Sequence, residues 1–81
     1  MFQNMSNSPS PIFIDAIGKP CPMPLLMLKK SLKQNVSGHV FIVKASDPHS
    51  QIDLARYCQI HHLSFECTLE SPTEFHYRIE N

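Results

Sequence analysis

The sequence has no tryptophan, only two glycines and three cysteines, and no net charge. Seven basic and seven acidic residues balance each other, so no long-range field attracts a phosphate backbone, and direct nucleic-acid binding is not expected. No apolar run is long enough to span a membrane, so no membrane role is expected either. An odd and small number of cysteines does not suit a disulfide-stapled secreted domain, which favours reduced thiols and a cytoplasmic location.

The length of 81 residues predicts one domain with a thin core, and we expect a monomer. Residues 1–11 are rich in Ser, Asn and Pro and have neither a basic leader nor an apolar stretch. They predict a flexible N-terminal tail and not a secretory signal. Residues 12–81 are then the single folded domain.

In the first half of this domain, the pattern of apolar residues changes once, from that of a strand to that of a helix. Ile12–Ala16 is a β-branched and aromatic run, which predicts a strand, and the Gly- and Pro-rich segment Gly18–Pro24 predicts a turn. A helix is expected from Pro22 to a stop at Gly38. Its apolar stripe consists of Leu25, Leu28, Leu32 and Val36.

The second half predicts a strand, a helix and two further strands. Residues 40–45 are apolar on both sides, which indicates a central strand. Asp47 is expected to cap a second helix with Pro48 at its first position. Residues 63–69 and 75–79 alternate between apolar and polar, as half-buried strands do. The expected buried side of the second helix is Ile52, Ala55 and Cys58 or Gln59.

This order, β-α-β-α-β-β, predicts an α/β two-layer sandwich. Right-handed crossovers would place both helices on one face of a four-stranded mixed sheet.

The segment around Cys21 carries the clearest chemical signal. Pro22 disfavours helical dihedrals at Cys21, which suits an N-cap residue followed by proline at the first helical position. Pro24 is tolerated there because the carbonyl that its ring would strike precedes the helix. A helix start favours a thiolate through its dipole and free N–H groups, and Lys19 could assist.

Cys21 has no partner in a Cys-x-x-Cys arrangement, so no local disulfide can form. A lone exposed thiol can instead accept a sulfur atom as a persulfide and pass it to another thiol. The alternative interpretation is that Cys21 is a small buried residue that only shapes a proline-rich turn.

Several segments together resemble the TusA-like (SirA-like) sulfurtransferase family. They are Asp15-Ala16-Ile17-Gly18, Cys21-Pro22-Met23-Pro24, Gly38, Ser46-Asp47-Pro48, Asp53 and Cys58. The resemblance runs from about Ile12 to the C-terminus and implies the same β-α-β-α-β-β fold.

The resemblance implies that Cys21 is the catalytic carrier residue. Its surroundings would be shaped by Gly18, Lys19, Pro20, Pro22, Met23 and Pro24, with Asp47, Asp53 and Cys58 as possible secondary residues. Members accept persulfide sulfur from a cysteine desulfurase or a rhodanese-type donor and relay it to an acceptor protein. No cofactor is implied beyond the transient persulfide. Met23 and Pro20 stand where tRNA-linked members carry an acidic and a basic residue, so the tRNA relay is not implied.

The remaining candidates have simpler interpretations. Cys58 is expected to pack in the core, and a second sulfur-accepting thiol is the alternative. Cys67 shares a strand face with Phe65 and Leu69 and is expected in the core. Cys58 and His62 stand four residues apart, but without a third ligand no metal site is expected.

Two other functions stay open from the sequence. One is a non-catalytic interaction or regulatory module, and the other is a thiol-redox protein that pairs Cys21 with Cys58.

Overall fold

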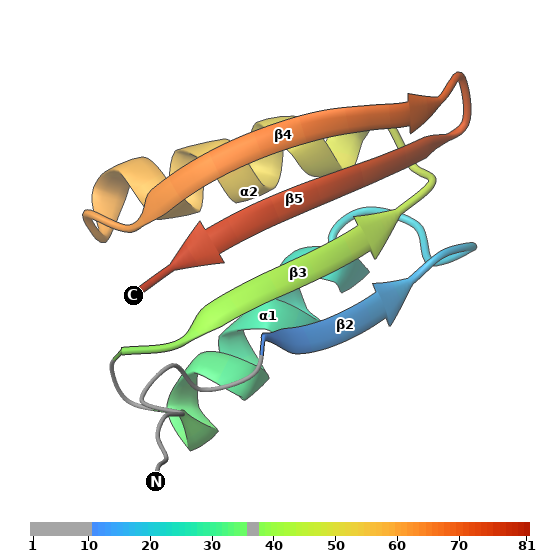
Figure 1. The fold of residues 1–81 in the computed structure, drawn as a ribbon. Coiled ribbons are helices and arrows are strands. Elements are labelled where there is room, and N and C mark those ends of the chain that lie inside the picture. The colour runs from blue at the N-terminus through green and yellow to red at the C-terminus, as the bar shows by residue number, and fades with distance from the viewer. Residues whose placement is uncertain (1–10, 36–37) are drawn as a thin grey trace, which may run out of the picture.

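The computed structural model describes residues 11–35 and 38–81, and within them the predicted order β-α-β-α-β-β is confirmed (Figure 1). The elements are β2 (Ile12–Ala16), α1 (Met23–Gln34), β3 (Val40–Ala45), α2 (His49–Ile60), β4 (Ser64–Ser71) and β5 (Glu74–Glu80). No helix in these ranges is long and apolar enough to cross a membrane.

The four strands form one mixed sheet in the order β2-β3-β5-β4. Strands β2 and β3 are parallel, whereas β5 is antiparallel to both β3 and β4. Both helices lie behind the sheet in Figure 1, so they cover one face of it, as predicted. Because β2 and β3 are parallel, their carboxyl ends meet at one edge, and the connections to α1 and α2 both leave from that edge.

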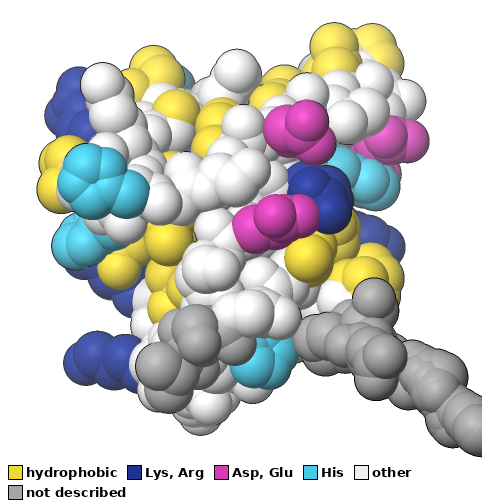
Figure 2. Space-filling view, turned by 60° about the vertical axis from the view of Figure 1, so that its left-hand side comes forward, with side chains coloured by type: hydrophobic (Ala, Val, Ile, Leu, Met, Phe, Trp, Pro, Cys, Tyr) yellow, Lys and Arg dark blue, Asp and Glu magenta, His cyan; other side chains and the backbone are white. Residues whose placement is uncertain are grey.

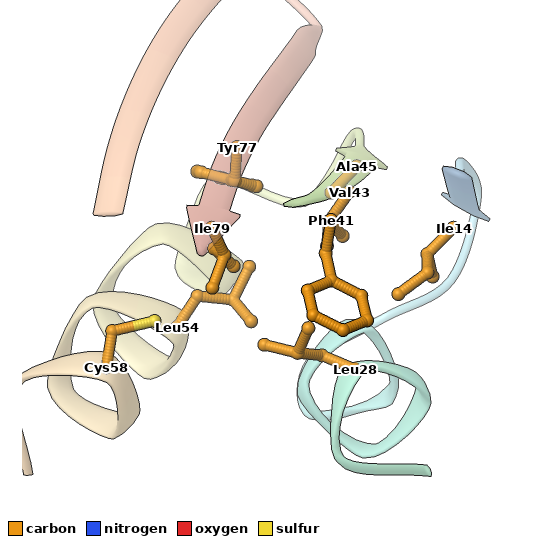
Figure 3. Close-up of a cluster of buried hydrophobic side chains, with 9 residues drawn as sticks. All are labelled: Ile14, Leu28, Phe41, Val43, Ala45, Leu54, Cys58, Tyr77 and Ile79. Carbon is orange, nitrogen blue, oxygen red and sulfur yellow. The ribbon is translucent and has the colours of Figure 1, made fainter. Parts of the chain in front are cut away.

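The core lies between the helices and this covered face of the sheet (Figure 3). Leu28 of α1 faces Phe41 of β3, and Leu54 of α2 faces Ile79 of β5. The buried cluster is Ile14, Leu28, Phe41, Val43, Ala45, Leu54, Cys58, Tyr77 and Ile79. Strand β3 alternates between half-buried and buried residues, which agrees with its predicted central position.

The opposite face of the sheet carries both charged side chains and apolar ones such as Phe13 and Ile42. Arg78 lies within 3.9 Å of Glu66 on the neighbouring strand and also pairs with Glu80. Figure 2 shows acidic, basic and apolar side chains interspersed on one side of the molecule.

The predicted buried side of α2 is partly wrong. Ser50, Leu54 and Cys58 are buried, whereas Ile52 is 57% exposed. The buried residues are four apart and so share one helix face, while Ile52 lies roughly 200° around the axis from Leu54. The polar residue Ser50 is inside because Tyr77 gives it a hydrogen-bonding partner.

The expected burial of Cys67 and Leu69 is also wrong, since both are exposed. Cys67 lies opposite Tyr77 in the sheet register. However, β4 is an outer strand, and among the described residues no further strand flanks it. Phe65 is half-buried, and its ring stacks on Tyr77 with 5.7 Å between the ring centroids.

Helix α1 is shorter than predicted. It begins at Met23, one residue after Pro22, and ends at Gln34, before Gly38. Gly38 has a φ of 77° in the turn that leads into β3, a conformation that favours glycine. The predicted core residue Val36 and residues 1–10 of the predicted tail lie outside the described residues.

Replacing Leu54 by alanine should lower the free energy of unfolding by about 2–5 kcal/mol, because a buried side chain is lost and a cavity remains. Ile52→Ala on the same helix is the matched control and should change it by no more than about 0.5 kcal/mol, because Ile52 is exposed. Urea denaturation of both variants measures this. Equal losses in the two variants would contradict the observed orientation of α2.

Candidate functional site

Cys21 lies in the turn between β2 and α1, and its side chain is exposed. Gly18 starts this turn with a φ of 79°, a backbone conformation that is strained for a residue with a side chain. The Lys19 N–H donates to the Ala16 carbonyl (3.0 Å) and the Met23 N–H donates to the Pro20 carbonyl (2.8 Å). These bonds form a compact turn that presents the thiol at the edge where both helices begin.

The β3–α2 connection holds this turn from the other side. The Gly18 N–H donates to the Ser46 hydroxyl (2.8 Å), and the Cys21 N–H donates to Asp47 Oδ2 (2.8 Å). The two connections, far apart in sequence, are therefore joined at the thiol.

Asp47 has the capping role that was predicted, although α2 begins at His49 and Pro48 precedes it. Asp47 Oδ1 accepts the His49 N–H (2.9 Å), and the Asp47 carbonyl accepts the Ser50 N–H (3.0 Å). Hydrogen bonds from the N–H groups of Cys21 and then His49 hold the pKa of Asp47 below its ordinary value. One carboxylate thus caps α2 and fixes the backbone of Cys21.

The thiol of Cys21 donates a hydrogen bond to Asp53 Oδ2 on the first turns of α2. This bond, then partial desolvation and the negative charges of Asp53 and Asp47, raise the pKa of Cys21 to about 11. The prediction that the start of α1 stabilises a thiolate at Cys21 is therefore wrong. Pro22 and Pro24 have no N–H groups, and the Met23 N–H is already bonded to Pro20.

The structure brings together most of the predicted site residues. Asp47 and Asp53 contact Cys21 directly, the first through the backbone and the second through the thiol. The exposed residues around Cys21 are Gly18, Lys19, Pro20, Pro22 and Met23, whereas Pro24, in the first turn of α1, is buried.

Cys58 is separate from this site. Its side chain is fully buried on the inner side of α2, beside Leu54 (Figure 3), which confirms the predicted packing role. Burial raises the pKa of the Cys58 thiol to about 11. No group of three His, Cys, Asp or Glu residues within the described ranges is arranged to hold a metal ion.

A buried polar contact behind the site was not predicted. The Ser50 hydroxyl donates to the Asp47 carbonyl (2.6 Å) and lies 2.9 Å from the Tyr77 hydroxyl of β5. Through Ser50, Tyr77 thereby stabilises the start of α2 from the core side. The signal in the sequence is a tyrosine on the apolar side of an alternating strand, because a buried hydroxyl requires a partner.

A shallow groove of about 270 Å³ leads away from the thiol between α1 and α2. It is lined by Leu25, Asp53, Arg56, Tyr57 and Ile60. A second groove, of about 340 Å³, lies between β2 and α1 and does not reach Cys21. Asp53 therefore belongs both to the thiol site and to the first groove.

The fold and site are those of a small two-layer α/β domain with an exposed thiol at the edge where its helices begin. The family model described as Sulfurtransferase TusA matches residues 12–81, and the chain belongs to this family. A crystal structure of a SirA-like protein from Desulfitobacterium hafniense is similar, with a TM-score of 0.77 and 26% sequence identity. The match covers 84% of this chain and 93% of that one. Membership implies a role in sulfur transfer together with other proteins.

Asp53→Asn should lower the pKa of Cys21 from about 11 toward its ordinary value, because the amide carries no negative charge to hold the proton. The rate of alkylation by iodoacetamide, followed by mass spectrometry between pH 7 and pH 11, measures this pKa. Both proteins should carry Cys67→Ser, since Cys67 is also exposed. At pH 8 each unit by which the pKa falls should raise the thiolate fraction, and with it the alkylation rate, by up to about ten-fold. Superimposable pH profiles would show that Asp53 does not hold the thiol proton.

Replacing Asp47 by asparagine should remove the contribution of the Asp47 carboxylate to the free energy of unfolding, and this contribution depends on pH. The pKa of Asp47 is depressed in the folded state, so its contribution is complete above the unfolded value of about 3.9 and is lost as the pH falls through the folded value. The difference in unfolding free energy between wild type and variant should therefore shrink below about pH 4. Urea denaturation from pH 6 to pH 2 tests this, and a constant difference would contradict it.

Proposed function

We propose that this protein is a sulfur carrier and that Cys21 holds the transferred sulfur as a persulfide. The observation that carries the proposal is the exposed Cys21 thiol, which a carboxylate holds at the meeting point of both helix starts. Membership of the TusA sulfurtransferase family supports it. Cys58 is buried, and the exposed Cys67 lies away from this edge, on β4.

Asp53 is placed to accept the thiol proton when Cys21 reacts. The Cys21 sulfur would attack the outer sulfur of a cysteine persulfide on the donor. One S–S bond forms at Cys21, the S–S bond of the donor breaks, and the donor cysteine leaves as a thiolate. The proton held by Asp53 returns to a thiolate, and no external oxidant or reductant is consumed. An acceptor thiol would take the sulfur from Cys21 by the same exchange.

The donor would be a cysteine desulfurase or a rhodanese-type protein, and the acceptor a second protein thiol. Residues 12–81 would act as one monomeric domain in the cytoplasm, with the persulfide in place of any cofactor.

The site gives less support to a thiol-redox cycle between Cys21 and Cys58. A disulfide requires two Cβ atoms about 4 Å apart with their sulfur atoms facing each other. Cys58 instead faces the sheet from the inner side of α2, while the Cys21 thiol points to Asp53 outside it.

Incubation of the reduced protein with a cysteine desulfurase and cysteine should add one sulfur atom to Cys21, as measured by intact mass and peptide mapping. Cys21→Ser should abolish this gain, because no other thiol lies at the site. Cys67→Ser and Cys58→Ala should retain it, and a reductant should reverse it. Undiminished gain in Cys21→Ser would place the carrier thiol elsewhere. Failure with several donors, while a known carrier gains sulfur in parallel, would favour a non-catalytic interaction module.

A further inference from the structure

The groove between α1 and α2 is continuous with the thiol site. Asp53, which accepts the Cys21 thiol hydrogen bond, is also a lining residue of the groove. Tyr57 and Ile60 follow Asp53 at intervals of four and three residues along α2, and Leu25 lies opposite on α1. Residues at this spacing share one helix face, so the groove extends from Asp53, at the thiol, along α2.

The groove is apolar at its base. Leu25 and Tyr57 are half-buried, and Ile60 is 63% exposed at the end distant from Cys21. The Lys29 ammonium lies 5.3 Å from the centroid of the Tyr57 ring, so it covers the α1 side. Such a base suits the side chains of an extended peptide segment.

The charges along the groove change sign with distance from the thiol. Asp47 and Asp53 are negative at Cys21, whereas Arg56 and Lys29 are positive beyond it. Neither Arg56 nor Lys29 forms an ion pair with any residue that the structure describes. At 1.5 Å per residue, Arg56 lies about 5 Å along α2 from Asp53, and Lys29 lies about 9 Å along α1 from its first residue, Met23. An extended segment reaches these distances in about two to three residues.

We propose that this groove receives the cysteine-bearing segment of the sulfur donor, an extended stretch with an acidic side chain about two to three residues from its persulfide. The persulfide would lie at Cys21 and the acidic side chain between Arg56 and Lys29. This proposal rests on the proposed carrier function and adds to it the chemistry of the donor segment.

Two synthetic peptide persulfides test the proposal, identical except for glutamate or lysine three residues from the cysteine. We expect the glutamate peptide to transfer sulfur to Cys21 at least about three-fold faster at low salt, an advantage that salt should remove. Arg56→Glu should reverse this preference, because the charge at the groove is reversed.

Arg78→Glu is the matched control, since it makes the same charge change on the opposite face of the sheet. On α1, Lys29→Glu should weaken the preference, whereas its neighbour Lys30→Glu, which lines the other groove, should not. Equal rates for the two peptides, or the same response in Arg56→Glu and Arg78→Glu, would overturn the proposal. Inorganic polysulfide should add sulfur to Cys21 in the wild type and in the Arg78→Glu control. Its failure to do so in the wild type would instead count against the carrier function itself.

Discussion

The site depends on the carboxylate of Asp47. One of its oxygens accepts the N–H of His49 at the start of α2, and the other accepts the N–H of Cys21. Two connections that lie 26 residues apart are thereby fixed to each other. The buried contact between Ser50 and Tyr77 holds the same connection from the core side. The position of the thiol relative to Asp53 follows from this arrangement, because Asp53 is carried by the helix that Asp47 caps.

The hydrogen bond to Asp53 and the negative charges of Asp53 and Asp47 favour the protonated form of Cys21. Thiolates are the reactive form of cysteine, and a pKa of about 11 leaves very little thiolate at neutral pH. Reaction requires that the proton move to Asp53 or that the negative charge beside the thiol be compensated. The carboxylates at Cys21 therefore govern the proton on its thiol.

Hydrophobic period and turn residues were sufficient to predict the order and type of every described element. They were insufficient where burial depends on the position of an element within the sheet. Cys67 and Leu69 stand at the apolar positions of an alternating strand, but that strand is an outer one. Ile52 is apolar yet faces solvent. Cys21 could be selected because prolines and a helix start surround it in sequence. The direction of the pKa shift of Cys21 could not be predicted, because Asp53 lies 32 residues away in sequence and contacts the thiol only in the folded chain.

Onward transfer from purified, persulfidated protein tests the central claim most directly. The protein is loaded with radiolabelled sulfur, freed of the donor, and mixed with a second protein that offers a reactive thiol. The account predicts that up to one labelled sulfur per chain leaves Cys21 and appears on the acceptor, and that without an acceptor the label stays on Cys21. Label that never leaves Cys21 in the presence of several acceptor proteins, or that is released only as free sulfide, would contradict a carrier role.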